Sequence, residues 1–99
     1  MAAASQQFTA DDVRERLQTA SEVARCIIHF ETGGTYNPNL VGAQGELGPA
    51  QLNPRGKLPA FLAQGYTDPR DPWQAIDFLE VQLRQGQGNH WSPVTRGLC

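Results

Sequence analysis

The amino-acid sequence predicts a small, mainly α-helical domain that carries a short β-hairpin or loop lobe. Its 99 residues are 39% hydrophobic, which is enough for one modest core. Apolar residues recur at helical spacing behind capping residues in both halves of the chain. Between these halves, residues 33–54 hold five glycines and three prolines, which favour turns over a long helix. We therefore expect a flexible lead over residues 1–8 and a single domain over residues 9–99.

The first predicted helix begins after Thr9. Asp12 follows three residues later, a helix-start signature in which each side chain caps the backbone N–H of the other residue. Val13 and Leu17 lie one turn apart and are expected to face the core. Together these signals predict a helix of about ten residues.

The second predicted helix is the central one. Ser21, or Thr19 with Glu22, can cap its start, and two glycines after Thr32 end it. Its apolar residues are Val23, Ala24, Cys26, Ile27, Ile28 and Phe30. A helix with so wide an apolar surface is expected in the middle of the domain.

Two further helices are predicted in the C-terminal half. A short helix spans residues 58–64 and is ended by Gly65. A longer helix is capped by Asp71, has Pro72 at its first position and stops at Gly86. The expected core face of the longer helix consists of Trp73, Ile76, Leu79 and Leu83.

The composition argues against several classes of function. The net charge is -2 and Lys57 is the only lysine, so the chain offers no basic field for nucleic acid. No apolar run approaches the roughly 20 residues that a membrane span requires. Residues 1–7 lack the basic start and the long apolar region of a secretory signal. Two cysteines, with His29 and His90 at no zinc spacing from them, predict no metal site, and we expect no cofactor.

Glu31 closes the second predicted helix on its apolar side. It lies three and four positions beyond Ile28 and Ile27, so it projects from the apolar face. Partial burial and the negative end of the helix dipole both disfavour the carboxylate, so the pKa of Glu31 should rise. A raised pKa suits proton donation near neutral pH. The alternative is a solvated residue, as most glutamates are.

Glu31 also begins a series of spaced motifs. They are Glu31-Thr32-Gly33-Gly34, Asn37-Pro38, the small-residue stretch 41–45, and Gly48-Pro49-Ala50-Gln51. In this order they resemble the core of the lysozyme-like superfamily, above all soluble lytic transglycosylases, resuscitation-promoting factors and phage muralytic domains. Those proteins have a helix ending in Glu-Ser-Gly-Gly, an Asn-Pro, a hairpin, and then Gly-Leu-Met-Gln or Gly-Leu-Gln. The resemblance covers residues 21–54.

The resemblance implies an α+β lysozyme-like fold, with a cleft between the helices and the hairpin lobe. It implies cleavage of the β-1,4 bond between MurNAc and GlcNAc in peptidoglycan strands, by a lytic transglycosylase or a muramidase, with Glu31 as general acid and base. Lytic transglycosylases work with one glutamate, whereas other glycosidases use a second carboxylate. Glu46, in the expected hairpin, is the candidate for that second acid; otherwise it is a solvated hairpin residue.

Four other residues are candidates for substrate binding. Gln51 matches the family glutamine that faces the sugar groove, or else it caps its own loop. Thr32 could hydrogen-bond the substrate or cap the helix end. Tyr36 and Trp91 could stack on sugar rings through their aromatic faces.

The two cysteines have two interpretations. Cys26 lies on the second predicted helix, where a buried free thiol is the default interpretation. The resemblance adds an alternative, because some resuscitation-promoting factors tie the catalytic helix to a C-terminal cysteine. Cys26 would then form a disulfide with Cys99.

Two classes of function follow. The first is a muralytic enzyme that a phage particle or tail, with its other proteins, carries to the bacterial cell wall. The second is a non-catalytic structural or glycan-binding module of a virion or secretion assembly. Both are expected to be made in the cytoplasm without a signal peptide.

Overall fold

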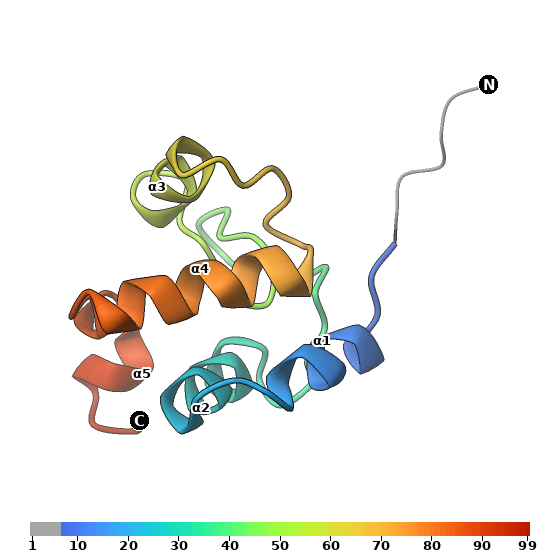
Figure 1. Cartoon of the computed structure of the whole chain (residues 1–99), viewed down its shortest axis with the longest axis horizontal. Helices are drawn as coiled ribbons and strands as arrows, with labels where there is room; N and C mark the ends of the chain where they lie inside the picture. The colour runs from blue at the N-terminus through green and yellow to red at the C-terminus, as the bar shows by residue number, and fades with distance from the viewer. Residues whose placement is uncertain (1–6) are drawn as a thin grey trace.

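The computed structural model describes residues 7–99 of the chain, and it is mainly α-helical, as predicted (Figure 1). Its helices are α1 (Ala10–Leu17), α2 (Glu22–Glu31), α3 (Lys57–Ala63), α4 (Pro72–Arg84), the short 3-10 helix η1 (Gly88–His90) and α5 (Ser92–Thr95). None of the helices within residues 7–99 is long and apolar enough to cross a membrane.

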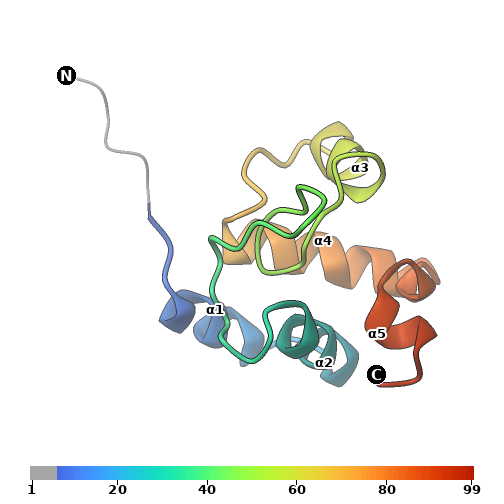
Figure 2. The ribbon, with the colours of Figure 1, turned by 180° about the vertical axis from the view of Figure 1, so that it is seen from behind.

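The longest helix, α4, runs through the middle of the molecule. It contacts α1 and α2 on one side, and α3 lies on the other (Figure 1). At the end of the chain, α5 returns to contact α2. Figure 2 shows the loop lobe running from the end of α2 across α4 to the start of α3. The lobe and the end of α2 are therefore neighbours in space.

The predicted start signals of α1, α2 and α4 are confirmed. Thr9 and Asp12 form the reciprocal capping box, with backbone-to-side-chain distances of 3.2 and 2.9 Å. Ser21 caps the first turn of α2, and Asp71 caps that of α4 just before Pro72. For α3, the observed bounds differ from the predicted ones by one residue at each end, which is the usual uncertainty of a helix boundary.

One cluster of buried apolar side chains joins α1, α2, α4, α3 and the lobe. Its members are Val13, Leu17, Ala20, Ala24, Ile27, Ile28, Ala50, Leu52, Phe61, Ala75, Ile76, Phe78, Leu79 and Trp91. The predicted core position of Trp73 is wrong, because its side chain is 40% exposed. The buried stripe of α4 is centred on Ala75 and Leu79, and Trp73 lies on another side of the helix.

The lobe of residues 33–54 is a loop with two isolated β-bridges, not a pair of strands. Val41 pairs with Leu47, and Leu47 pairs with Leu52 through two backbone hydrogen bonds of 3.1 and 2.9 Å. Gly48 has a φ of 79° and lies against the backbone of Pro69. A Cβ atom on Gly48 would be 2.0 Å from the Pro69 carbonyl oxygen, so only glycine permits this close approach.

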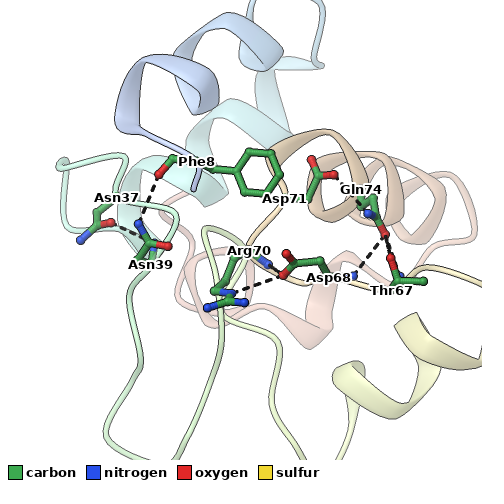
Figure 3. A network of polar contacts seen from close by, with 8 residues as sticks. All are labelled: Phe8, Asn37, Asn39, Thr67, Asp68, Arg70, Asp71 and Gln74. Atoms are coloured by element: carbon green, nitrogen blue, oxygen red, sulfur yellow. Dashed lines mark hydrogen bonds and ion pairs between the residues drawn. The ribbon is translucent and has the colours of Figure 1, made fainter. Parts of the chain in front are cut away.

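The connection before α4 is held by a network of polar contacts (Figure 3). The side-chain oxygen of Gln74 accepts hydrogen bonds from the backbone N–H groups of Thr67, at 2.7 Å, and Asp68, at 3.3 Å. The Asp68 carboxylate in turn accepts hydrogen bonds from the backbone N–H and the Nε of Arg70. These contacts fix the segment that packs on Gly48.

The predicted flexible lead over residues 1–8 is wrong at its last residue. Phe8 is buried, and its carbonyl oxygen accepts a hydrogen bond of 3.2 Å from Asn39 Nδ2 (Figure 3). A large aromatic ring gains more by burial than the ordering of one residue costs, so the packed part of the chain includes Phe8. Residues 1–6 of the predicted lead lie outside the described residues.

The chain after α4 contains two helices that the sequence analysis did not predict. Gly86 ends α4 as expected, but η1 and α5 follow it closely. Pro93 lies in the first turn of α5 and is buried. The last residue, Cys99, is joined to Cys26 of α2 by a disulfide. The contact between α5 and α2 is therefore reinforced by a covalent link.

Candidate functional site

Glu31 is the last residue of α2, and its half-buried side chain borders a pocket of about 260 Å³. The helix ends here because Gly33 and Gly34 both have positive φ, which turns the chain out of the helix into the lobe. Residues from α2, the lobe, α3, η1 and the start of α5 line the pocket: Glu31, Glu46, Gln51, Asn53, Lys57, His90, Trp91 and Ser92. The site is thus assembled from segments far apart in the sequence.

The pKa of Glu31 is raised from 4.5 to about 7. Burial is the larger cause, because removing the carboxylate from water disfavours its charged form. Repulsion by the Glu46 carboxylate is the second cause. Near neutral pH both the protonated and the ionised forms of Glu31 are therefore populated, as general acid and base catalysis requires.

Glu46 is held in the pocket by the lobe. Its carboxylate oxygen Oε1 accepts a hydrogen bond of 2.7 Å from the backbone N–H of Gln44, and its carbonyl oxygen accepts one of 2.8 Å from Gly42 N–H. A Cβ atom on Gly42 would lie 2.8 Å from Glu46 Oε1 and 2.7 Å from Gln51 Oε1. Gly42 therefore leaves the space in which these two side chains approach each other, a role that the sequence analysis missed.

Gln51 caps its own loop, as its alternative prediction stated, and it also lines the pocket. It has a φ of 51°, and its side-chain Nε2 donates hydrogen bonds to the carbonyl oxygens of Gly48, at 2.8 Å, and Leu40, at 3.3 Å. Its amide nitrogen thus stabilises the loop. Gln51 also lines the pocket, where its side-chain oxygen remains as an acceptor.

Thr32 caps the helix and does not reach the pocket, which corrects its prediction as a substrate-binding residue. It is 3% exposed. Its hydroxyl donates a hydrogen bond of 2.8 Å to the Ile28 carbonyl oxygen and accepts one of 3.0 Å from the backbone N–H of Tyr36. A hydroxyl just after a helix commonly satisfies the backbone in this way.

Tyr36 also lies away from the Glu31 pocket. It lines a separate depression with Arg14 and Arg25, and the Arg14 guanidinium lies 5.2 Å from the centre of its ring. Its hydroxyl is 3.2 Å from Nδ1 of His29. The positive φ of Tyr36, 56°, turns it to this side, and local sequence gives little warning of such a backbone conformation.

Trp91 borders the pocket but is only 4% exposed, so its ring is not a free face for a sugar. Its indole N–H donates a hydrogen bond of 3.0 Å to the carbonyl oxygen of Ala50, next to Gln51. The prediction that Trp91 stacks on a sugar is therefore corrected. Trp91 supports the pocket by joining the chain before α5 to the lobe. Buried tryptophans usually find such a partner for the N–H.

Lys57 lines the pocket, although the sequence did not predict it as a site residue. Its ammonium donates a hydrogen bond of 2.6 Å to Gln82 Oε1 and lies 5.4 Å from the centre of the Trp91 ring. Burial lowers the pKa of Lys57. The one feature of the sequence that could have pointed to Lys57 is that it is the only lysine in the chain.

Within residues 7–99, no group of three His, Cys, Asp or Glu side chains could hold a metal ion. The pocket instead presents two carboxyl groups, one of them protonated in part at neutral pH, together with amide, imidazole and ammonium groups. Such a set can donate a proton and bind a polyhydroxylated ligand. No protein-family model, curated protein or solved structure matches the chain.

Proposed function

We propose that this protein is a peptidoglycan-cleaving glycosidase of the lysozyme-like type, with Glu31 as general acid and base. One observation carries the proposal: a half-buried carboxyl group with a pKa of about 7 lies in a pocket that it shares with Glu46. The order of motifs from Glu31 to Gln51 supports the same function. Delivery to the bacterial wall by a phage particle or tail is part of the proposal.

Glu31 gives up one proton and recovers one in each turnover. With a pKa of about 7, about half of the Glu31 side chains are protonated at neutral pH. The protonated form donates to the glycosidic oxygen while the bond to the anomeric carbon breaks. The resulting carboxylate then accepts a proton from the attacking hydroxyl. If that hydroxyl is the 6-hydroxyl of the substrate, the product is a 1,6-anhydro sugar; if it belongs to water, the product is a reducing end.

Glu46 and Gln51 assist this chemistry from the lobe. The Glu46 carboxylate raises the pKa of Glu31, and its negative charge favours the oxocarbenium-like centre that develops during cleavage. Gln51 has its amide nitrogen committed to the loop, so its side-chain oxygen is the group that accepts a hydrogen bond from a sugar hydroxyl.

Zymography on peptidoglycan tests the proposal with wild type, Glu31→Gln and Glu15→Gln. Glu15 is an exposed glutamate on α1 and is the matched control. We expect clearing by wild type and Glu15→Gln, and a loss of at least about a hundredfold in Glu31→Gln, because the proton donor is removed while the size of the side chain is kept. Circular dichroism confirms that each variant is folded.

Clearing that survives in Glu31→Gln contradicts the mechanism. A folded wild type that clears no peptidoglycan contradicts the enzymatic function and favours a non-catalytic glycan-binding or structural module. Where clearing occurs, mass spectrometry of the released muropeptides distinguishes a 1,6-anhydro end from a reducing end, and hence a transglycosylase from a muramidase.

A further inference from the structure

A second pocket, of about 550 Å³, adjoins the Glu31 pocket. The two pockets share Asn53, Lys57 and His90, which makes them neighbours along one groove. The second pocket is completed by Arg55, Gly56 and Ala60. A ligand longer than one sugar that reaches Glu31 can therefore continue over the start of α3.

The two ends of this groove differ in charge. The Glu31 pocket contains both carboxyl side chains, whereas no acidic residue lines the second pocket. Two cationic residues line the second pocket: Arg55, which does not line the Glu31 pocket, and Lys57, which lines both. Neither belongs to an ion pair in the described part of the chain. The second pocket is thus an electropositive end without a carboxylate of its own.

The backbone of Arg55 and the ammonium group of Lys57 are held in place. The backbone N–H of Arg55 donates a hydrogen bond of 2.7 Å to Asn53 Oδ1, which fixes the turn and leaves the exposed guanidinium to the groove. Lys57 is fixed by Gln82 and lies over the Trp91 ring, and an ammonium group retains further donors beyond that one bond. An ammonium group that is fixed in advance, as in Lys57, loses less entropy when it binds an anion.

We propose that the second pocket binds a carboxylate carried by the muramyl substituent of the glycan strand. This inference rests on the proposed function, since it places the strand in the same groove. The source of the carboxylate is either the lactyl group of a peptide-free MurNAc or the stem peptide attached to it. Binding there orients the strand, because a MurNAc over the start of α3 fixes which glycosidic bond lies at Glu31.

Binding measurements on the Glu31→Gln protein test the inference without turnover. The ligands are a chitin oligosaccharide, which has no carboxylate, a peptide-free MurNAc-GlcNAc oligomer and the same oligomer with its stem peptides. We expect a carboxylate-bearing oligomer to bind about tenfold more tightly than the chitin oligosaccharide, since one charge-assisted hydrogen bond contributes this much. This preference should decrease at high salt.

Variants at Arg55 identify the pocket. Adding Arg55→Gln should remove the tenfold preference, Arg55→Lys should restore part of it, and Arg96→Gln, at an exposed arginine after α5, should leave it unchanged. A preference for only the peptide-bearing oligomer identifies the stem peptide as the source. A preference for only the peptide-free oligomer identifies the lactyl group, whose carboxylate becomes an amide when the peptide is attached, and a preference for both means that the pocket accepts either carboxylate. Equal binding of all three ligands, or equal effects of Arg55→Gln and Arg96→Gln, overturns the inference.

The failure of this inference is distinct from the failure of the proposed function. A wild-type protein that clears peptidoglycan but shows no carboxylate preference overturns the inference alone. A protein that clears nothing but shows the preference lost in Arg55→Gln supports the inference and overturns the enzymatic function. Absence of binding to all three oligosaccharides overturns the inference as well.

Discussion

At the scale of single residues, the burial that suits Glu31 for proton transfer also lowers the stability of the folded protein when Glu31 is ionised. Its pKa is about 7 in the folded protein and 4.5 in the reference state. Below pH 4.5 Glu31 is protonated in both the folded and the unfolded chain, so it does not make the free energy of unfolding depend on pH. Between pH 4.5 and 7 only the folded state keeps the proton, so the free energy of unfolding decreases as pH rises.

The first stability prediction follows from this decrease in the free energy of unfolding with rising pH. Glu31→Gln should raise the free energy of unfolding above pH 7 by about 1 to 2 kcal/mol, a value below the full shift because the site is partly solvated. At pH 4 the variant and the wild type should be equally stable, because the amide resembles the protonated acid. Urea denaturation at pH 4 and pH 8 measures both differences.

Glu15→Gln is again the control, since Glu15 is exposed on α1. Relative to wild type, Glu15→Gln should change the free energy of unfolding by nearly the same amount at pH 4 and at pH 8, unlike Glu31→Gln. Equal stability of Glu31→Gln and wild type at pH 8 would mean that the carboxylate of Glu31 is not disfavoured in the folded protein.

The sequence predicted the residues of the site where the signal is local, and failed where it depends on distant partners. The position of Glu31 on the apolar side of a helix is readable from spacing alone, and the structure buries it in part. The burial of Trp91 depends on the Ala50 carbonyl, which is 41 residues away in sequence. The turn of Tyr36 away from the pocket depends on a left-handed backbone conformation that a tyrosine rarely adopts.

At the scale of elements, capping chemistry made the helices predictable. Thr9, Ser21 and Asp71 each cap the helix that they were expected to cap, because the side chain and the N–H that it binds lie within three residues. The lobe was predicted only as turns or a hairpin, because its shape depends on packing against the connection before α4. The helices η1 and α5 have only three and four residues, which is too short for a helical repeat to show in the sequence.

Gly48 gives the second stability prediction. Gly48→Ala should lower the free energy of unfolding by about 2 to 4 kcal/mol, because a positive φ and a clash with backbone act together. The clash would move the lobe that carries Glu46 and Gln51, so ligand binding should weaken as well. Chemical denaturation measures the loss of stability.

Gly86→Ala separates the two causes. Gly86 has a similar φ of 77°, but nothing lies within 4 Å of an added Cβ atom. Its substitution should cost only about 1 to 2 kcal/mol, the effect of the backbone conformation alone. If Gly48→Ala is no worse than Gly86→Ala, the lobe is able to shift away from Pro69 at little cost, and the close approach is not needed for the fold.

At the scale of the whole molecule, the site depends on how the C-terminal segment is held against the lobe and α2. The lobe supplies Glu46 and Gln51, whereas His90, Trp91 and Ser92 come from the region after α4. Trp91 links this region to the lobe, and the Cys26–Cys99 disulfide links it to α2, five residues before Glu31. The C-terminal segment therefore closes one wall of the pocket and is attached at two points.

The disulfide gives the last prediction. It joins residues 73 apart in sequence, and in the chain-entropy description a loop of this length stabilises the folded state by about 4 kcal/mol. This is a large fraction of the stability of a chain of this size. Reduction of the wild type should therefore lower the melting temperature, whereas the melting temperature of Cys26→Ser/Cys99→Ser should be lower from the start and unaffected by reductant.

The structure also predicts which part of the molecule changes when the link is lost. Because α5 contacts both α2 and η1, and this region carries one wall of the pocket, amide hydrogen exchange should increase over residues 88–99 before it increases in α4. A wild type whose melting temperature and exchange are the same with and without reductant would show that packing of Trp91 and Pro93 alone holds the C-terminal segment in place.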